Sequence, residues 1–140
     1  MRGIFLLISV IILSVPTFAQ KPAAAPKIAS KKGYDIIHPY NKKGWAKVER
    51  DHKIGFIDRN GQEVVPCRYD EIYPYEKGLA KVLLNGKFGL ITDVADAEPL
   101  VEPKYDYIGP FKNGLALVAL NGRRGLINEK GEEVVELDAK

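Results

Sequence analysis

The side chains that could carry out covalent or metal chemistry are few and are scattered along the sequence. Cys67 is the single cysteine, so it has no partner for an intramolecular disulfide, and no histidine adjoins it to activate it as a nucleophile. His38 and His52 are separated by a spacing that suggests no metal site. We therefore predict a partly buried structural thiol at Cys67, and no catalytic residue, metal site or cofactor.

The acidic residues offer two further possibilities. Asp93, Asp96 and Glu98 could bind calcium weakly, but they lack the ligand spacing and the glycine of a calcium-binding loop. This absence favours a solvated loop. Three other aspartates recur in equivalent places: Asp35, Asp70 and Asp106. A catalytic carboxylate pair would occur once rather than three times. The repetition predicts instead that these aspartates fix local turns by accepting backbone N–H bonds.

The chain repeats itself from Tyr34 onward with a period of 35 or 36 residues. Each copy begins with Tyr-Asp and reaches a proline followed by an aromatic residue, at 34–40, 69–75 and 105–111. A glycine, a large apolar residue, Ala and a later Val follow, at 44–48, 78–82 and 114–118. A second glycine then precedes an apolar pair, at 55–57, 89–91 and 125–127. Such self-similarity indicates a repeat architecture, with copies at roughly 34–68, 69–104 and 105–140.

The local pattern of each copy predicts strands. Ala-x-Val has the period of a half-buried strand, and Asn85-Gly86 and Asn121-Gly122 have the chemistry of tight hairpin turns. The predicted strands are 45–50, 54–58 and 62–66; 79–84, 87–92 and 99–103; and 115–120, 123–128 and 132–136. Pro66 and Pro103 are expected to end the third strand of their copies. The Tyr-Asp segment is expected to link one meander to the next, and Asp51-His52 to form a looser turn.

These features resemble the WG repeat family, also described as KWG repeats, over essentially all of residues 34–140. The resemblance rests on Gly-Leu/Trp-Ala-x-Val, on Asn-Gly-Lys-x-Gly followed by an apolar pair, and on Tyr-Asp-x-Ile-x-Pro-aromatic. The tryptophan usual before the second glycine is replaced by Ile54, Phe88 and Arg124. The third copy lacks the final Pro and Tyr-Asp and resembles a degenerate terminal unit. The resemblance implies repeat modules of exported bacterial proteins, with no common reaction.

We therefore expect an all-β fold: a tandem, open, solenoid-like array of three antiparallel three-stranded β-meanders. One meander cannot bury enough apolar surface alone, so neighbours must stack. The predicted inward positions are Ala46, Val48, Ala80, Val82, Leu84, Ala116, Val118 and Leu120, with Ile57, Ile91, Ile127, Ile37, Ile72 and Ile108. The opposite face becomes less polar from Lys47 and Glu49 to Leu117 and Ala119. Either this face docks a partner, or the array curls and buries it against the chain itself.

Residues 1–19 have the features of an export signal and its helix. Arg2 precedes a nearly continuous apolar run from Ile4 to Val15, and Thr17 to Ala19 place small residues where a signal peptidase reads them. We expect cleavage after Ala19 and a secreted or periplasmic protein with no stable membrane span, since the run is too short for one. An uncleaved anchor is the alternative. Residues 20–33, with two prolines and four lysines, predict a flexible spacer.

The distribution of charge argues against a nucleic-acid partner. Five of the 21 basic residues precede Tyr34 and all 18 acidic residues follow it, which leaves residues 34–140 with 16 basic and 18 acidic residues. We expect an exported, non-enzymatic binding module for a protein or polysaccharide of the cell envelope. The sequence does not indicate its oligomeric state. The alternatives are a small envelope enzyme or enzyme inhibitor, with a cleft near the loop at 92–97, and a purely structural filler.

Six residues are candidates for contact with such a partner: Trp45, Tyr73, Tyr75, Leu83, Phe111 and Leu117. The tyrosines and Phe111 lie in the segments between copies, where rings stacked along a repeat would bind sugars or peptide segments. Packing between the repeats is the alternative role for these rings. Leu83 and Leu117 lie on the less polar strand face.

Overall fold

The computed structural model describes residues 33–138, which form strands, turns and loops. The predicted export signal and the predicted spacer, apart from Gly33, lie outside the described residues. Within residues 33–138 there is no helix that is long and apolar enough to cross a membrane. The prediction of an all-β fold is confirmed.

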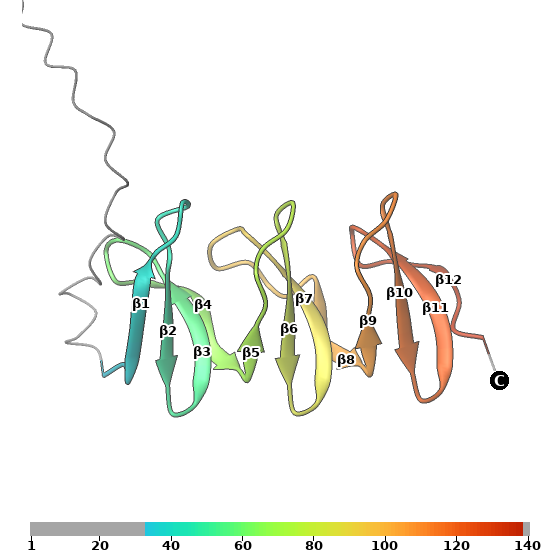
Figure 1. Ribbon diagram of the computed structural model, residues 1–140, viewed down its shortest axis with the longest axis horizontal. Coiled ribbons are helices and arrows are strands. Elements are labelled where there is room, and N and C mark those ends of the chain that lie inside the picture. The colour runs from blue at the N-terminus through green and yellow to red at the C-terminus, as the bar shows by residue number, and fades with distance from the viewer. Residues whose placement is uncertain (1–32, 139–140) are drawn as a thin grey trace, which may run out of the picture.

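Three antiparallel four-stranded sheets follow one another along the long axis of the molecule (Figure 1). The first sheet contains β1 (Ile36–Tyr40), β2 (Ala46–Arg50), β3 (Lys53–Ile57) and β4 (Glu63–Tyr69). The second contains β5 (Glu71–Ile72), β6 (Leu79–Leu84), β7 (Lys87–Thr92) and β8 (Val101–Tyr105). The third contains β9 (Tyr107–Ile108), β10 (Leu115–Leu120), β11 (Arg123–Asn128) and β12 (Glu133–Val135). Each sheet is an open meander built from one copy of the repeat, so the tandem array is confirmed.

Each sheet has four strands rather than three, because the Tyr-Asp segment pairs with the strand that follows it. In the second sheet, Asp70 N–H donates to Leu83 O over 2.8 Å, and Tyr73 N–H donates to Lys81 O over 2.9 Å. Strands β5 and β9 have only two residues each, and a proline follows two positions later. Such short strands give no readable period-two pattern, so the sequence suggests a linker where the structure has an edge strand.

Strands β4 and β8 continue through Pro66 and Pro103, which are expected from the sequence to end them. Both are edge strands, where a proline can be placed without loss of a ladder hydrogen bond. The register with the neighbouring strand shifts at this point, as in a β-bulge. The recurring second glycine lies against the bulge: a Cβ on Gly89 would stand 2.8 Å from the nitrogen of Pro103. Close backbone approach therefore explains why that glycine repeats.

The recurring aspartates fix turns, as predicted. The carboxylate of Asp35 accepts the backbone N–H of Asp51 at 2.9 Å. Asp106 accepts the N–H of Asn121 at 2.8 Å, in the turn between β10 and β11. Each aspartate thus ties the start of its sheet to the hairpin turn between the sheet's second and third strands.

The inner face of each sheet is the side that carries the alternating Ala and Val of the second strand. In the first sheet, Ala46, Val48 and Ile57 are fully buried. They pack against side chains of the same unit: Tyr34, Ile37, Tyr40 and Cys67. The predicted inward positions of the other sheets are buried as well, except that Leu84 and Leu120 are half-buried, as is Ile37 in the first sheet.

The outer face is the opposite side of each sheet, which carries Lys47, Lys81 or Leu117. The outer face of the first sheet packs on the second sheet in one cluster that includes Phe56, Val65, Ile72 and Val82. The outer face of the second sheet packs on the third in a cluster that includes Leu90, Val101, Ile108 and Val118. These two junctions bury the apolar surface that no single meander could bury alone.

The outer face of the third sheet is exposed, since no described residue covers it. Leu117 is 43% exposed and Val135 is 50% exposed, whereas Val101, at the position of Val135 in the second sheet, is only 5% exposed. The chain buries the less polar face in the first two units, as one of the two alternatives predicts. It leaves this face open in the third unit, where docking of a partner stays a prediction.

Candidate functional site

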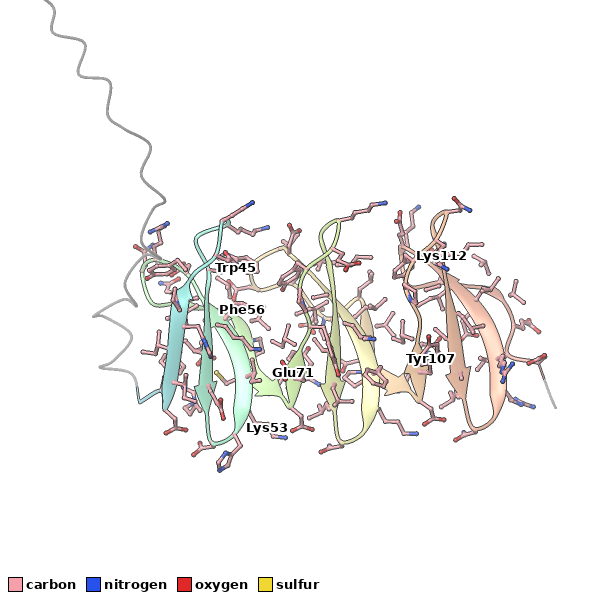
Figure 2. All side chains as sticks on the ribbon, viewed as in Figure 1. Trp45, Lys53, Phe56, Glu71, Tyr107 and Lys112 are labelled. Atoms are coloured by element: carbon pink, nitrogen blue, oxygen red, sulfur yellow. The ribbon has the colours of Figure 1, made fainter. Side chains whose placement is uncertain are left out.

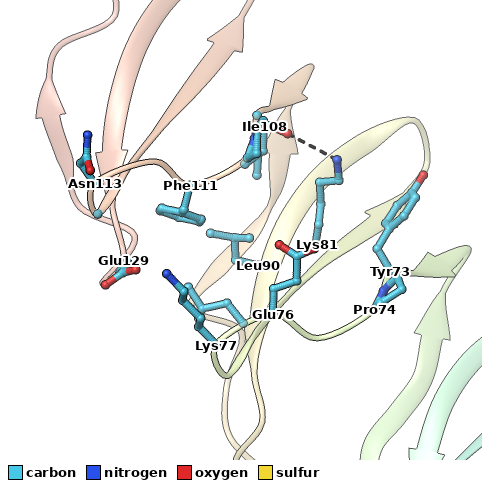
Figure 3. A pocket seen from close by; sticks show the side chains of 14 residues that line it. Tyr73, Pro74, Glu76, Lys77, Lys81, Leu90, Ile108, Phe111, Asn113 and Glu129 are labelled. Carbon is cyan, nitrogen blue, oxygen red and sulfur yellow. Dashed lines mark hydrogen bonds between the residues drawn. The ribbon is translucent and has the colours of Figure 1, made fainter.

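The aromatic side chains at the second junction border a cavity of about 360 Å³ (Figure 3). Tyr73 follows β5 and Phe111 follows β9, each at the same Pro-containing segment of its repeat. Proline restricts the backbone of both segments, which holds the neighbouring rings at the junction. The remaining apolar lining comes from both sheets and includes Leu79, Leu90 and Ile108.

The cavity exists because two large rings of the first junction are absent from the second. In the first junction, Trp45, Phe56 and Tyr75 pack together with ring centroids 5.9–6.2 Å apart. Figure 2 shows Trp45 and Phe56 side by side at this place. One repeat later, Leu79 and Leu90 occupy the positions of Trp45 and Phe56. The leucines leave unfilled the volume that the indole and the phenyl ring occupy in the first junction.

Charged side chains of both signs line the cavity: Glu76, Lys77, Lys81 and Glu129. The ammonium of Lys81 lies 3.4 Å from the carbonyl oxygen of Ile108, a long hydrogen bond that leaves most of its hydrogen-bonding capacity free. It also lies 5.0 Å from the centre of the Tyr73 ring, as a cation–π contact. The cavity therefore combines apolar walls with a few polar groups, as small binding sites in proteins do.

The structure places the six predicted contact residues in four different environments. Tyr73 and Phe111 line the cavity together. Trp45 and Tyr75 pack in the core of the first junction, where Trp45 is only 6% exposed. Leu83 is half-buried in the second sheet, and Leu117 is exposed on the third, so these two do not form one patch with the rings.

Sequence reasoning missed Leu79, Leu90 and the charged residues of the cavity. The signal that finds them is a comparison of equivalent positions between copies, in which Trp45 becomes Leu79 and Phe56 becomes Leu90. A reduction in side-chain volume at two positions of one junction predicts a cavity, provided that the backbones of the two junctions match.

A second cavity, of about 320 Å³, lies beside the loop of the second copy. Its lining includes Arg68, Asp96, Glu98 and Thr92, whose buried hydroxyl is without a hydrogen-bond partner in the described part of the chain. No histidine or cysteine lines it. Asp93 points elsewhere, since it pairs with Lys43 at 2.9 Å. The cleft expected by the enzyme hypothesis is thus present, but it has no nucleophile paired with a base.

The remaining reactive groups are the single cysteine and the two histidines. Burial raises the pKa of the Cys67 thiol to about 11, with the nearby Glu63 carboxylate adding to the effect, so the thiol stays protonated and unreactive at neutral pH. Neither His38 nor His52 lines either cavity. Among residues 33–138, no three His, Cys, Asp or Glu side chains are grouped closely enough to hold a metal ion.

The stacked meanders and their junctions define the chain as a tandem β-repeat protein. A model of the family "WG containing repeat" matches residues 54–88 and 96–123, which span both junctions. Each of these two segments is therefore a WG-containing repeat. No curated protein and no solved structure is significantly similar to it.

Proposed function

We propose that this protein is an exported, non-enzymatic binding module, and that the second junction binds a segment of another protein. The proposal rests on one observation: two junctions are built on the same plan, and only the second lacks the rings that fill it. A space of about 360 Å³ is large enough to hold a large apolar side chain with part of its backbone.

The charges around the cavity favour a peptide over a polysaccharide. Lys77 and Lys81 would attract acidic groups, and Glu76 and Glu129 basic ones, so a segment with charges on both sides of an apolar residue complements the site. A neutral sugar would use the aromatic walls but not the charges. Binding of envelope polysaccharide in place of peptide is therefore a distinct outcome of the test.

The test is a variant that fills the cavity with the residue of the first junction. Peptides selected from a random library against immobilised protein would be measured against wild type and Leu79→Trp. We expect selected peptides to carry a large apolar residue flanked by charges, and to lose at least about tenfold in affinity, or about 1.4 kcal/mol, with the variant.

The matched control is Leu115→Trp, the same substitution at the equivalent position of the third copy, which does not line the cavity. It should leave the affinity of the selected peptides unchanged. Equal binding of those peptides to wild type and to a folded Leu79→Trp variant would overturn the assignment of the site. Binding of envelope polysaccharide alone, lost in the same variant, would keep the site and replace the partner.

Export is part of the same proposal and has its own test. The basic start, the apolar run and the small residues at 17–19 support cleavage after Ala19. N-terminal sequencing of the protein recovered from the cell envelope or medium should begin at Gln20. An intact Met1 terminus on membrane-bound protein would show an uncleaved anchor.

A further inference from the structure

The two junctions inside the chain show what covers an outer face: the beginning of the next repeat. Strand β3 contacts β5, and β4 contacts β6, so the last two strands of one sheet meet the first two of the next. The same contacts join β7 to β9 and β8 to β10. The beginning of a repeat of this chain therefore shows what kind of surface would fit the outer face of the third sheet.

One contact defines the register of the first junction. The ammonium of Lys47, on the outer face of the first sheet, pairs with the carboxylate of Glu71 in β5 at 2.9 Å. At the equivalent places, the third sheet has Leu117 on its outer face, and the first sheet has Ile36 in β1. Leu117 is 43% exposed and Ile36 is 46% exposed. The charged pair of the first junction thus corresponds to two exposed apolar residues at opposite ends of the array.

We propose that the outer face of the third sheet docks the first sheet of a second copy of this chain, head to tail. In the register of the internal junctions, Leu117 would meet Ile36 of the second copy. Leu117 lies opposite Leu126 and Ile36 lies opposite Glu49 in their own sheets, yet both side chains remain more than 40% exposed, so burial of both would favour association. This interface is separate from the cavity at the second junction, so it stands whether or not that cavity binds peptide.

Further residues at both ends agree with this register. Tyr75 covers Trp45 and Phe56 in the first junction, and Tyr40, its equivalent in the first sheet, would cover Leu115 and Leu126. Figure 2 shows Glu71 on the second sheet and Tyr107 on the third. Ile36 is the equivalent residue of the first sheet by its position in the repeat. At the edge of the face, Arg124 replaces Ile54 and Phe88, so the rim there is polar while the centre is apolar.

Head-to-tail contact of this kind does not close on itself, so the complexes should grow with concentration rather than stop at a dimer. In an internal junction the two repeats are covalently connected, which gives their contact surfaces a high effective concentration. A junction between separate molecules lacks this connection. The weight-average mass of the purified exported protein, measured by sedimentation over a wide range of concentration, should therefore rise steadily.

Two single variants and their combination test the register. Leu117→Lys and Ile36→Glu each place a charge against an apolar residue, and each should keep the protein monomeric. The chain that carries both substitutions recreates the Lys47–Glu71 pair between molecules and should associate again. Its association should weaken at high salt, whereas that of the wild type should not.

Circular dichroism and thermal unfolding provide the folding control, and both substituted side chains are exposed in the native protein. If one variant folds poorly, the other tests the opposite end of the same interface independently. A wild-type protein that remains monomeric at the highest soluble concentration overturns the proposal. Association that survives both single substitutions overturns it as well, since another surface must then carry the contact.

Discussion

The carboxylate of Asp70 accepts the backbone N–H of Asn85 at 2.8 Å, which ties the beginning of the second sheet to its central hairpin turn. The same carboxylate pairs with Lys53, in the third strand of the preceding sheet. One side chain therefore links a turn, an edge strand and the neighbouring repeat. Asp106 repeats the arrangement with Asn121 and Lys87.

These bonds predict a dependence of stability on pH. Hydrogen bonds from the Lys53 ammonium and the Asn85 N–H lower the pKa of Asp70 below its usual value, and Asp106 is shifted in the same direction by Lys87 and Asn121. A carboxyl with a lower pKa in the folded state stabilises the fold above its unfolded pKa of about 3.9, and this contribution disappears as pH falls through the folded value. Stability should therefore decline below about pH 4.

Asp70→Asn should reduce stability at neutral pH and flatten the decline in acid, because the amide does not ionise. Urea unfolding midpoints at pH 7 and pH 3, compared between wild type and variant, measure both effects. Asp96→Asn, in the exposed loop of the second copy, is the control and should change neither. If the stability of Asp70→Asn falls in acid as steeply as that of the wild type, the decline is caused by other carboxyl groups.

The second glycine of each copy should tolerate no side chain. Gly89 faces the bulged edge strand, and a Cβ there would stand 2.8 Å from the nitrogen of Pro103, which is fixed backbone. We expect Gly89→Ala to cost about 3 kcal/mol of stability, at the upper end for overpacking.

Gly86→Ala is the matched control, since Gly86 has open space around it and only a positive φ of 77°. That strain should cost about 1 kcal/mol. Denaturant unfolding of the two variants gives the comparison. Equal losses would mean that the bulge moves away from the added methyl group.

The turn between β2 and β3 is not looser than the others, contrary to the expectation from its sequence. Asp51 and His52 adopt positive φ values of 52° and 61°, close to the 52° and 77° of Asn85 and Gly86. Arg50 pairs directly with Lys53, so the loop has two residues in each case. The first turn thus adopts the same geometry with residues that are strained in it.

Replacement of Asp51-His52 by Asn-Gly should therefore stabilise the protein by about 1 kcal/mol, through the release of that strain. The reciprocal change of Asn85-Gly86 to Asp-His should destabilise it by a similar amount. Thermal unfolding of both double variants checks the pair. A loss of stability in the first variant would show that the side chain of His52 contributes more than its backbone costs.

The sequence predicts most of this fold, because three copies of one pattern support each strand assignment where a single segment would be ambiguous. All nine predicted strands are present, and the largest boundary error is at the end of β4, which runs to Tyr69 rather than 66. That error and the missed fourth strands have one cause. Pairing at the unit boundaries depends on backbone contact with the neighbouring strand, which no short side-chain pattern reveals.

The candidate site was less predictable. Tyr73 and Phe111 are identifiable as aromatics of the segments between copies, but the candidates from the sequence also include Trp45 and Tyr75, which pack in the core of the first junction. Equivalent positions have different roles because each junction is filled by side chains of two consecutive repeats. Only the arrangement in space shows which rings fill a junction and which border a cavity.

The contrast between the two junctions gives a final prediction at Trp45. Trp45→Leu gives the first junction the residue that the second has at Leu79, and should open a cavity beside Phe56 and Tyr75. Loss of the buried indole should cost about 3 kcal/mol, since the surrounding side chains relax only partly. Free indole should then bind the variant and raise its thermal midpoint, as a ligand of the folded state does, while wild type gains less. Urea unfolding and thermal scans with and without indole measure both effects. If the variant loses little stability and indole has no effect on it, the first junction collapses around the smaller residue, and the cavity of the second junction then needs a cause other than its leucines.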